Sequence, residues 1–393
     1  MEYSIKLIKS TFYKEKQTIE ALCRFLKSAG QLSIGEQCHE FEAVFSKWQE
    51  RKFSSLFNSG SSANLALIQA LLNLGKLQPG MNVGFSGITW ATNVMPLMQL
   101  GLRPIPIDIS LENLNVSPKT LEQAHKKHSL DCVFLTNLLG FSDDMVAIAK
   151  YCKEQNILLI EDNCESMGSR TQGKKLGNFG VASTFSFFVG HHMSAIEGGM
   201  VCTDDKELDQ QLRMARSHGW DRHLSVTQQK SLRKTHEISD FFAKYTFYDL
   251  AYNLRPNEIT GFLGKYQLKF IEETIKKREK NFQKFLQIYD ICEDVYPLHI
   301  TMDFVSNFAM PVVFTSAKKM EEYRKKCEKR NIEVRPIVGG VMSDQPFFKK
   351  YIKQKFDIPN SRLAYTQGFY FANNPELTKD EVQYIIDTFR PNV

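Results

Sequence analysis

The sequence lacks the features that identify several common classes of protein. Its eight cysteines are never closer than twelve residues apart, so no Cys-x-x-Cys pair exists for a zinc ribbon or a typical iron–sulfur site. Cysteines scattered in this way are typical of buried thiols in a reducing compartment. No apolar run approaches the roughly 20 residues that cross a membrane, and the first residues contain no signal-peptide core. We therefore expect a cytoplasmic protein with no metal centre and no membrane partner.

A long basic tract is absent as well. The net charge of +6 is spread over 393 residues, and the lysine pairs are short and isolated. This pattern argues against nucleic acid as a partner, although a modest positive excess helps to attract a phosphorylated substrate. With 42% hydrophobic and 24% charged residues, the composition is that of a globular protein without long disordered regions.

Apolar runs and helical patterns alternate along the first part of the chain. We expect strands near residues 54–57, 82–86, 103–108, 132–136 and 157–160, and helices near residues 65–74, 118–127 and 143–154. This βα alternation predicts an α/β fold with a mostly parallel central sheet.

The chain is long enough for two domains. We predict a large α/β domain over residues 1–256, which begins with a helical segment. A long helical pattern over residues 257–291 links it to a smaller α+β C-terminal domain, so the second unit spans residues 257–393. Residues 217–256 form a long, aromatic-rich segment, and a long loop inside a compact chain is usually functional.

Candidate ligand-binding groups follow two of the predicted strands. The apolar run at residues 157–160 leads directly into Glu161 and Asp162. Ligands bind at the carboxyl ends of buried parallel strands. The Ser-Gly-Ser-Ser segment at residues 59–62 opens a predicted helix, where free backbone N–H groups bind a phosphate well. A plain serine N-cap explains the same segment.

These features together meet the needs of a flat, phosphorylated, nitrogen-containing cofactor, namely an anion for a protonated ring nitrogen, a phosphate cup and a stacking face. Asp162 is the candidate for the ring nitrogen, and Trp90 is the candidate for the ring face. Ser61, Ser62 and Ser186 are the candidates for the phosphate. Each residue also has a simpler role open to it, as a structural acid, a core aromatic, a helix cap or an ordinary strand residue.

Six motifs in sequence order carry a resemblance to a known family. They are Gly30-x-Leu-Ser-x-Gly35 with Phe41-Glu42, Ser59-Gly60-Ser61-Ser62-Ala63, Thr89-Trp90-Ala91-Thr92, Glu161-Asp162, Ser186-Phe187 and Glu197-Gly198-Gly199. The set resembles the DegT/DnrJ/EryC1/StrS family of sugar aminotransferases over essentially the whole chain. The resemblance implies an enzyme that uses pyridoxal 5'-phosphate (PLP) and has fold type I, like aspartate aminotransferase.

The chain departs from this family at the residue that binds the cofactor covalently. In the family, a lysine lies five residues after the serine of the Ser-Phe pair and six before the acid of Glu-Gly-Gly. Both counts lead here to His191, and no lysine occurs between Lys175 and Lys206. Histidine forms no stable Schiff base with an aldehyde. PLP, or pyridoxamine 5'-phosphate, is therefore expected to be held non-covalently, and His191 suits a general base because its ordinary pKa is near 6.5.

A histidine at this position is typical of a smaller group in the family, the PLP-dependent 3-dehydratases of dideoxysugar synthesis. The segments at residues 216–222, 252–256 and 335–338 resemble the branch that acts on a GDP-linked sugar. The resemblance implies removal of the C3 hydroxyl from a nucleotide-linked 4-keto-6-deoxyhexose, with L-glutamate as cosubstrate. The resemblance implies GDP-4-keto-6-deoxy-D-mannose as substrate, while the residues themselves leave another nucleotide or another ketosugar open. The expected pathway supplies a surface polysaccharide such as the O-antigen of lipopolysaccharide.

A second branch of these dehydratases carries an iron–sulfur cluster on closely spaced cysteines. This chain has Trp220-Asp221-Arg222-His223 where those cysteines would begin. We therefore expect no iron–sulfur cluster. Two other functions stay open, namely a sugar aminotransferase that releases an amino sugar and an inert PLP-binding paralogue.

The resemblance also implies roles for residues outside the six motifs. Glu165 would bond the phenolic oxygen of the cofactor. Asn253 would reach the cofactor phosphate of the neighbouring subunit, in a homodimer with shared active sites. Candidates for binding the glutamate carboxylate or the nucleotide phosphates, or for ordinary ion pairs, are His218, Arg222, Arg255 and Arg335.

Overall fold

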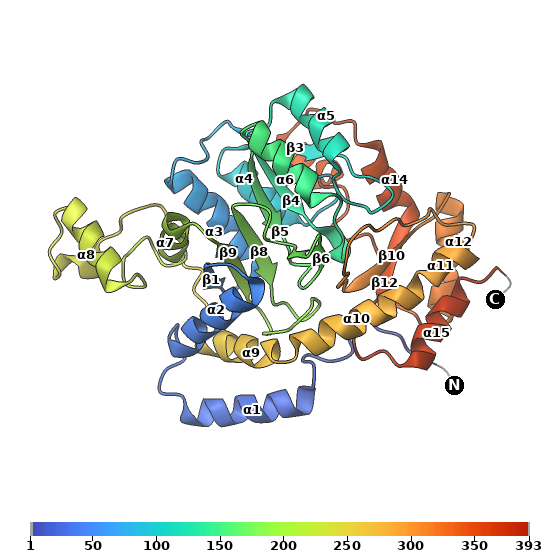
Figure 1. The fold of residues 1–393 in the computed structure, drawn as a ribbon, viewed down its shortest axis with the longest axis horizontal. Helices are drawn as coiled ribbons and strands as arrows, with labels where there is room; N and C mark the ends of the chain where they lie inside the picture. Colours follow the sequence, from blue (N-terminus) through green and yellow to red (C-terminus); the bar gives the residue numbers. More distant parts are fainter. Residues whose placement is uncertain (1–2, 392–393) are drawn as a thin grey trace.

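The computed structural model of the protein describes residues 3–391, which are organised around a seven-stranded sheet (Figure 1). Its strands, in spatial order, are β1 (Phe53–Phe57), β9 (Gly199–Thr203), β8 (Ala182–Ser186), β5 (Leu158–Asp162), β4 (Cys132–Thr136), β2 (Asn82–Ser86) and β3 (Arg103–Ile107). Strand β9 runs antiparallel to both of its neighbours, and the other pairs are parallel. The prediction of an α/β fold with a mostly parallel sheet is confirmed.

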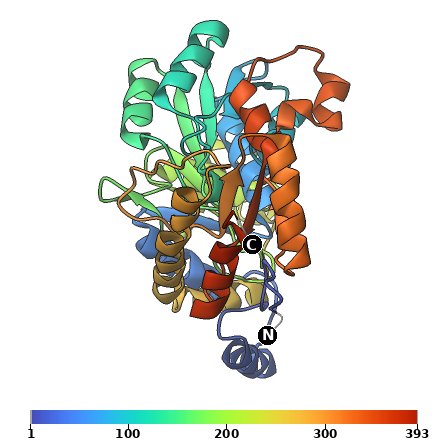
Figure 2. The ribbon, with the colours of Figure 1, turned by 90° about the vertical axis from the view of Figure 1, so that its right-hand side faces the viewer.

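Helices cover both faces of this sheet (Figures 1 and 2). The helices of this part of the chain are α1 (Glu15–Ser28), α2 (Glu36–Gln49), α3 (Gly60–Asn73), α4 (Met95–Gln99), α5 (Pro118–His128), α6 (Met145–Glu154), α7 (Lys206–Ala215) and α8 (Val226–Thr235), with the 3-10 helices η1 (Ala91–Asn93), η2 (Leu138–Gly140) and η3 (Phe242–Tyr245). Leucines of α3 and α7 pack with Val201 on one face, whereas Phe45 of α2 packs with Phe185 and Met200 on the other. The inner strands are therefore buried on both faces, which explains why apolar and small residues predominate in them.

The rest of the chain forms a second, smaller sheet with its own core. Its antiparallel strands lie in the order β10 (Ala309–Val313), β12 (Gly368–Ala372), β11 (Val334–Pro336). The helices of this part are α9 (Glu258–Leu268), α10 (Ile271–Phe285), α11 (Gln287–Ile291), α12 (Ala317–Lys329), α13 (Pro346–Tyr351), α14 (Pro359–Gln367), α15 (Lys379–Thr388) and η4 (Met342–Asp344), and a small hairpin pairs β6 (Arg170–Thr171) with β7 (Lys174–Lys175). Phe285, Phe314 and Phe371 belong to its core.

The single long helix expected over residues 257–291 is wrong, because three consecutive helices occupy this stretch. Leu263 of α9 packs in the core with α2, whereas Phe282 and Phe285 of α10 pack in the core of the smaller sheet. The break at Phe270 therefore falls where the chain passes from one core toward the other. The domain boundary after residue 256 stays a prediction.

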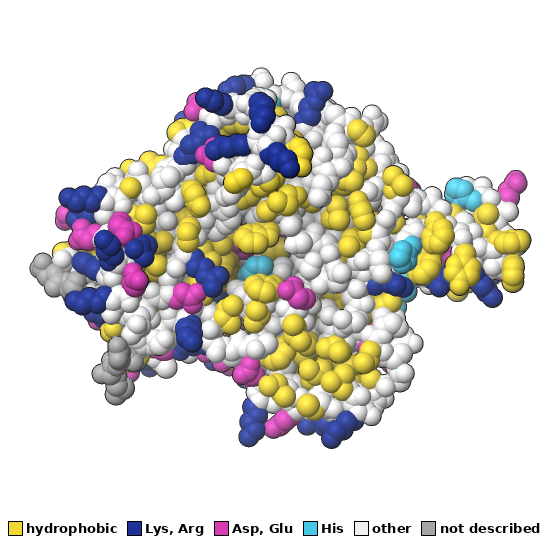
Figure 3. Space-filling view, turned by 180° about the vertical axis from the view of Figure 1, so that it is seen from behind, with side chains coloured by type: hydrophobic (Ala, Val, Ile, Leu, Met, Phe, Trp, Pro, Cys, Tyr) yellow, Lys and Arg dark blue, Asp and Glu magenta, His cyan; other side chains and the backbone are white. Residues whose placement is uncertain are grey.

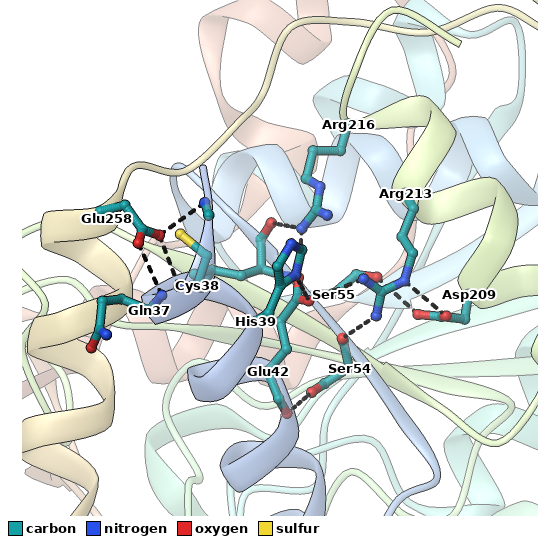
Figure 4. Close-up of polar contacts among 12 residues, drawn as sticks. Gln37, Cys38, His39, Glu42, Ser54, Ser55, Asp209, Arg213, Arg216 and Glu258 are labelled. Carbon is teal, nitrogen blue, oxygen red and sulfur yellow. Dashed lines mark hydrogen bonds and ion pairs between the residues drawn. The ribbon is translucent and has the colours of Figure 1, made fainter. Parts of the chain in front are cut away.

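A buried ionic cluster fixes α2 against β1 and α7 (Figure 4). The Glu42 carboxylate accepts hydrogen bonds from Arg216 at 2.6 Å and from Arg213 at 3.0 Å, and also from the backbone N–H of Leu56. Burial alone raises the pKa of Glu42, but the two guanidiniums hold that pKa well below its usual range. Because Arg216 belongs to this cluster, the cluster also fixes the start of the segment that follows α7.

That segment contains an arm, residues 225–250, that projects from the body of the protein (Figures 1 and 3). It carries α8 and η3 and leaves large apolar side chains exposed, namely Val226, Phe241, Phe242, Tyr245, Phe247 and Leu250. A patch of this kind on a folded protein marks an interaction surface. Among residues 3–391, no helix combines the length and the hydrophobicity needed to cross a membrane.

Candidate active site

A cavity of about 370 Å³ opens at the carboxyl ends of β4, β5 and β8, where Thr136, Asp162 and Ser186 contribute to its wall. Ligand pockets are generally of this size or larger and lie at this edge of α/β sheets. The smaller sheet closes the opposite side through Phe308, Arg335 and Tyr370. The cavity therefore lies between the two sheets.

Asp162 is a buried carboxylate held by neutral donors. Its Oδ2 accepts hydrogen bonds from the side chains of Asn64 at 3.0 Å and Asn93 at 2.7 Å, and its Oδ1 accepts one from the backbone N–H of Cys164. No lysine, arginine or histidine within residues 3–391 forms an ion pair with it. A buried anion fixed in this way suits a cationic group of a ligand, such as a protonated ring nitrogen.

The start of α3 forms one end of the cavity together with Ser186. Ser59, Gly60 and Ser61 line it, and the first-turn N–H groups of a helix have no carbonyl partner within the helix. A Cβ atom at Gly60 would lie 2.7 Å from Ser186 Cβ, so only glycine lets the helix start so close to β8. Ser62, by contrast, is not among the lining residues, and its backbone N–H donates to the N-cap hydroxyl of Ser59.

Trp90 and Glu165 line the cavity from two other segments. Trp90 is 55% exposed, so it is not the core aromatic that the alternative interpretation required. Glu165 accepts a hydrogen bond from the Leu139 N–H at 2.7 Å. Burial, with a smaller contribution from the nearby charge of Asp162, raises the pKa of Glu165 to about 8. The hydrogen bond from Leu139 lowers this pKa and so partly offsets the rise. This shift favours the protonated form of Glu165 at neutral pH, which can donate a hydrogen bond into the cavity.

His191 lies on the loop between β8 and β9, with its ring in edge contact with Phe188 and Phe308. Its Nδ1 is buried and has no hydrogen-bond partner among the described residues. Burial lowers the pKa of His191 to about 4, although the charge of Asp162 raises it. The imidazole is therefore neutral at pH 7 and has a free lone pair for a proton. The adjacent His192 is buried, and its Nε2 contacts the Ser306 carbonyl at 2.7 Å.

The remaining predicted residues are divided between the cavity and the base of the arm. Arg335 lines the cavity and pairs with Glu333 at 2.8 Å. Arg222 lies 3.8 Å from the ring centroid of Trp220, and Arg255 Nε donates to Asn253. Asn253, Arg222, Arg255 and His218 are absent from the lining of the cavity in the single chain.

Several cavity residues were not predicted from the sequence. Asn64 and Asn93 had a usable signal, because each is a polar residue directly after a predicted motif and both are buried. Phe308, Tyr370 and Leu7 had none, since they come from distant parts of the chain and resemble ordinary core residues.

The groups present fit PLP or pyridoxamine phosphate. Asp162 provides the anion, the start of α3 with Ser186 provides the phosphate cup, and Trp90 provides an exposed aromatic face. At the place where the covalent lysine of such enzymes would stand, the side chain is the unpaired imidazole of His191.

Comparisons with known proteins identify the family and the fold. Residues 13–390 match the DegT/DnrJ/EryC1/StrS aminotransferase family. The chain is 34% identical over 345 residues to a GDP-4-keto-6-deoxy-D-mannose 3-dehydratase of Yersinia pseudotuberculosis, with 84% of each sequence covered. A solved structure of the E. coli enzyme of that name, with bound hydrated PLP, has a TM-score of 0.90 at 29% identity, covering 99% of this chain and 100% of that one. A solved structure of a GDP-4-keto-6-deoxymannose-3-dehydratase with a trapped PLP-glutamate geminal diamine also has a TM-score of 0.90 at 29% identity, covering 98% of this chain and 100% of that one. The aminotransferase-like fold is thereby confirmed.

Proposed function

This chain belongs to the DegT/DnrJ/EryC1/StrS aminotransferase family, and from that membership we propose that it is a PLP-dependent sugar 3-dehydratase. Its substrate would be a nucleotide-linked 4-keto-6-deoxyhexose, GDP-4-keto-6-deoxy-D-mannose, and L-glutamate would be its cosubstrate. The pathway would make a dideoxysugar for a surface polysaccharide. The cytoplasmic location expected from the sequence stays a prediction.

One observation carries this proposal. The cavity keeps the anion, the helix start and the aromatic face that a PLP enzyme needs, yet its covalent lysine is replaced by His191. A lysine there would bind the aldehyde and favour release of an aminated product by exchange. Without a lysine, His191 would have no amine to exchange with the bound sugar and would act only on protons, so loss of the C3 hydroxyl would be favoured over release of an aminated product.

The chain's own residues orient the cofactor and move protons. When bound, the cofactor supplies an aldehyde or amine beside an electron-withdrawing ring. Asp162 would hold the ring nitrogen in its protonated state, and the amides of α3 with Ser186 would fix the phosphate. Glu165, neutral at pH 7, would donate a hydrogen bond to the phenolic oxygen. His191, also neutral, would accept the proton removed in each half of the reaction and return it, as a general base and then a general acid.

We also propose that the active enzyme is a homodimer. The apolar side chains of the arm support a docking surface for a second copy. At the base of the arm, Asn253 is exposed and lies beside Arg255, whose guanidinium is 5.6 Å from the ring centroid of Trp220. In the dimer, Asn253 would reach the cofactor phosphate of the partner subunit, and the neighbouring His218, Arg222 and Arg255 would help to bind the nucleotide sugar.

The test follows from the atom balance of the reaction. For each sugar that loses its C3 oxygen, one L-glutamate is oxidised to one 2-oxoglutarate and one ammonia is released. The sugar gains no nitrogen. The enzyme with PLP, L-glutamate and GDP-4-keto-6-deoxy-D-mannose should therefore release 2-oxoglutarate and ammonia in equal amounts. Mass spectrometry should find a product lighter than the substrate by one oxygen.

The two other functions give different results in the same assay. A sugar aminotransferase retains the nitrogen on the sugar and releases no ammonia, and an inert PLP-binding protein forms no 2-oxoglutarate. Either result would overturn the proposed dehydration. The same assay with other nucleotide-linked 4-ketosugars tests the assignment of GDP.

A further inference from the structure

The N-terminal strap, residues 5–10, runs beside the smaller sheet and forms part of the cavity wall. Ile5 lies opposite Ile332, just before β11: its N–H donates to the Asn331 carbonyl at 2.9 Å, and its carbonyl accepts a hydrogen bond from the Glu333 N–H at 2.8 Å. Further along, Lys9 forms an ion pair with Glu381 at 2.6 Å. Between these two anchors, Leu7 and Ile8 line the cavity.

Glu333, directly before β11, is hydrogen-bonded both to the strap and to a residue that lines the cavity. Its Oε2 accepts a hydrogen bond from the Leu7 N–H at 3.0 Å. Its Oε1 accepts two bonds from Arg335, from Nε at 3.1 Å and from Nη2 at 2.8 Å. One carboxylate therefore fixes the position of the strap and the orientation of the guanidinium.

The orientation of Arg335 matters because its side chain is 56% exposed. A long exposed side chain samples many rotamers, and each that it loses on ligand binding lowers affinity. Glu333 occupies the Nε–Nη2 edge, and Nη1 has no hydrogen-bond partner among residues 3–391. The free Nη1 is therefore presented in advance to an anion in the cavity.

We propose that Glu333 is a positioning residue that holds Arg335 and the Leu7–Ile8 wall ready for an anionic ligand. The inference rests on the proposed function for the identity of the anion, which is either the carboxylate of L-glutamate or the diphosphate of the nucleotide sugar. Separate measurements of the KM for each substrate distinguish these two sources.

The experiment compares three variants of the PLP-loaded enzyme. Glu333→Ala removes both contacts, whereas Glu333→Gln keeps an oxygen acceptor for Leu7 and loses the charge that holds Arg335. Lys9→Ala is the matched control, because it releases the other anchor of the strap and touches neither Glu333 nor Arg335. Glutamate turnover is followed by the cofactor absorbance, and the strap is followed by hydrogen exchange of the Leu7 amide.

Glu333→Ala should raise the KM for one of the two anions about fivefold, the effect of losing one partly exposed charged pair, with little change in kcat. It should also speed exchange at Leu7 by about tenfold or more. Glu333→Gln should raise the same KM while the Leu7 amide stays protected. Lys9→Ala should speed exchange in the strap and leave both KM values within about twofold.

Unchanged KM values for both anions in Glu333→Ala would overturn the proposal. An equal rise in Lys9→Ala would also overturn it, because the effect would then belong to the strap alone. If the enzyme does not dehydrate the sugar, the proposal for Glu333 can still be tested. Hydrogen exchange at Leu7 requires no turnover, and the glutamate half of the reaction is measured without the sugar.

Discussion

The guanidinium of Arg278 donates a hydrogen bond of 3.2 Å to the main-chain carbonyl of His191. Arg278 lies on α10, and its other terminal nitrogen bonds the carbonyls of Phe308 and Asn373 at the edge of the smaller sheet. The loop that carries His191 is thus held from the far side of the cavity through its backbone. The imidazole Nδ1 has no hydrogen-bond partner among residues 3–391, as a proton-transfer group requires.

His191→Lys should convert a non-covalent site into a covalent one. The introduced amine faces a buried, apolar environment that favours its neutral, nucleophilic form, so it should form a borohydride-reducible bond with PLP. Mass spectrometry of the reduced protein measures the bond as a fixed mass increase. Dehydration should fall by at least about 100-fold, since a general base contributes that much or more.

His191→Asn is the control for this change, because it removes the base without adding an amine. It should lose dehydration to a similar degree and show no bound cofactor after borohydride treatment. If dehydration continues unchanged in either variant, His191 does not carry the proton transfer.

Glu165 should make the cofactor-free protein less stable as the pH rises from about 4.5 to about 8. In that window the folded protein keeps the proton on Glu165, whereas the unfolded chain has released it. Because the native state binds more protons, the free energy of unfolding falls with increasing pH, by at most about 5 kcal/mol.

Glu165→Gln, which is always neutral, should abolish this part of the pH dependence. Urea unfolding at pH 5 and pH 8 measures the effect, and Glu154→Gln on the surface of α6 serves as the control. Parallel pH profiles for the wild type and Glu165→Gln would show that Glu165 ionises normally in the folded protein.

The parts of this structure that were predictable from the sequence are those with a local signal. The strands at residues 82–86 and 132–136 have the expected bounds, because each is a short segment between turn residues, and the second contains a continuous apolar run. The unusual identity of residue 191 was found by counting between motifs. The far wall of the cavity was not predicted, because Tyr370 and Leu7 reach it only through long-range packing. The antiparallel direction of β9 also has no local signal, since it depends on which strands flank it.

Glu42→Gln should lower the free energy of unfolding by about 3–5 kcal/mol, because it leaves the buried Arg216 without its counter-charge. Glu40→Gln on the same helix removes a partly exposed pair with Lys265 and should cost about 1 kcal/mol or less. The pKa of Glu42 is held low, so its contribution is present above about pH 4.5 and is lost as the pH falls further. Urea unfolding of both variants at pH 7 and pH 4 tests the sign. Equal losses in the two variants would contradict the role assigned to the buried cluster.

Mixed dimers test whether two subunits share each active site. His191→Asn removes a group of the subunit's own cavity, whereas Asn253→Ala removes a group proposed to act in the partner's cavity. Each variant alone should be almost inactive. When the two are unfolded, mixed in equal amounts and refolded, random pairing puts half of the protein into mixed dimers. In these, one site contains both substitutions and the other contains neither, so about a quarter of the wild-type activity should return.

A purely structural role of Asn253 within its own subunit would not restore activity in the mixed dimers. If Asn253 served only its own subunit, every site in the mixed dimer would carry one substitution, and no activity would return. Asn253→Ala mixed with the wild type is the control for refolding yield. A further control replaces the exposed Phe241 and Tyr245 of the arm by serine in one of the variants. Because these side chains are proposed to dock against the second copy, their loss should weaken pairing, and size-exclusion chromatography should show monomer together with a reduced recovery of activity.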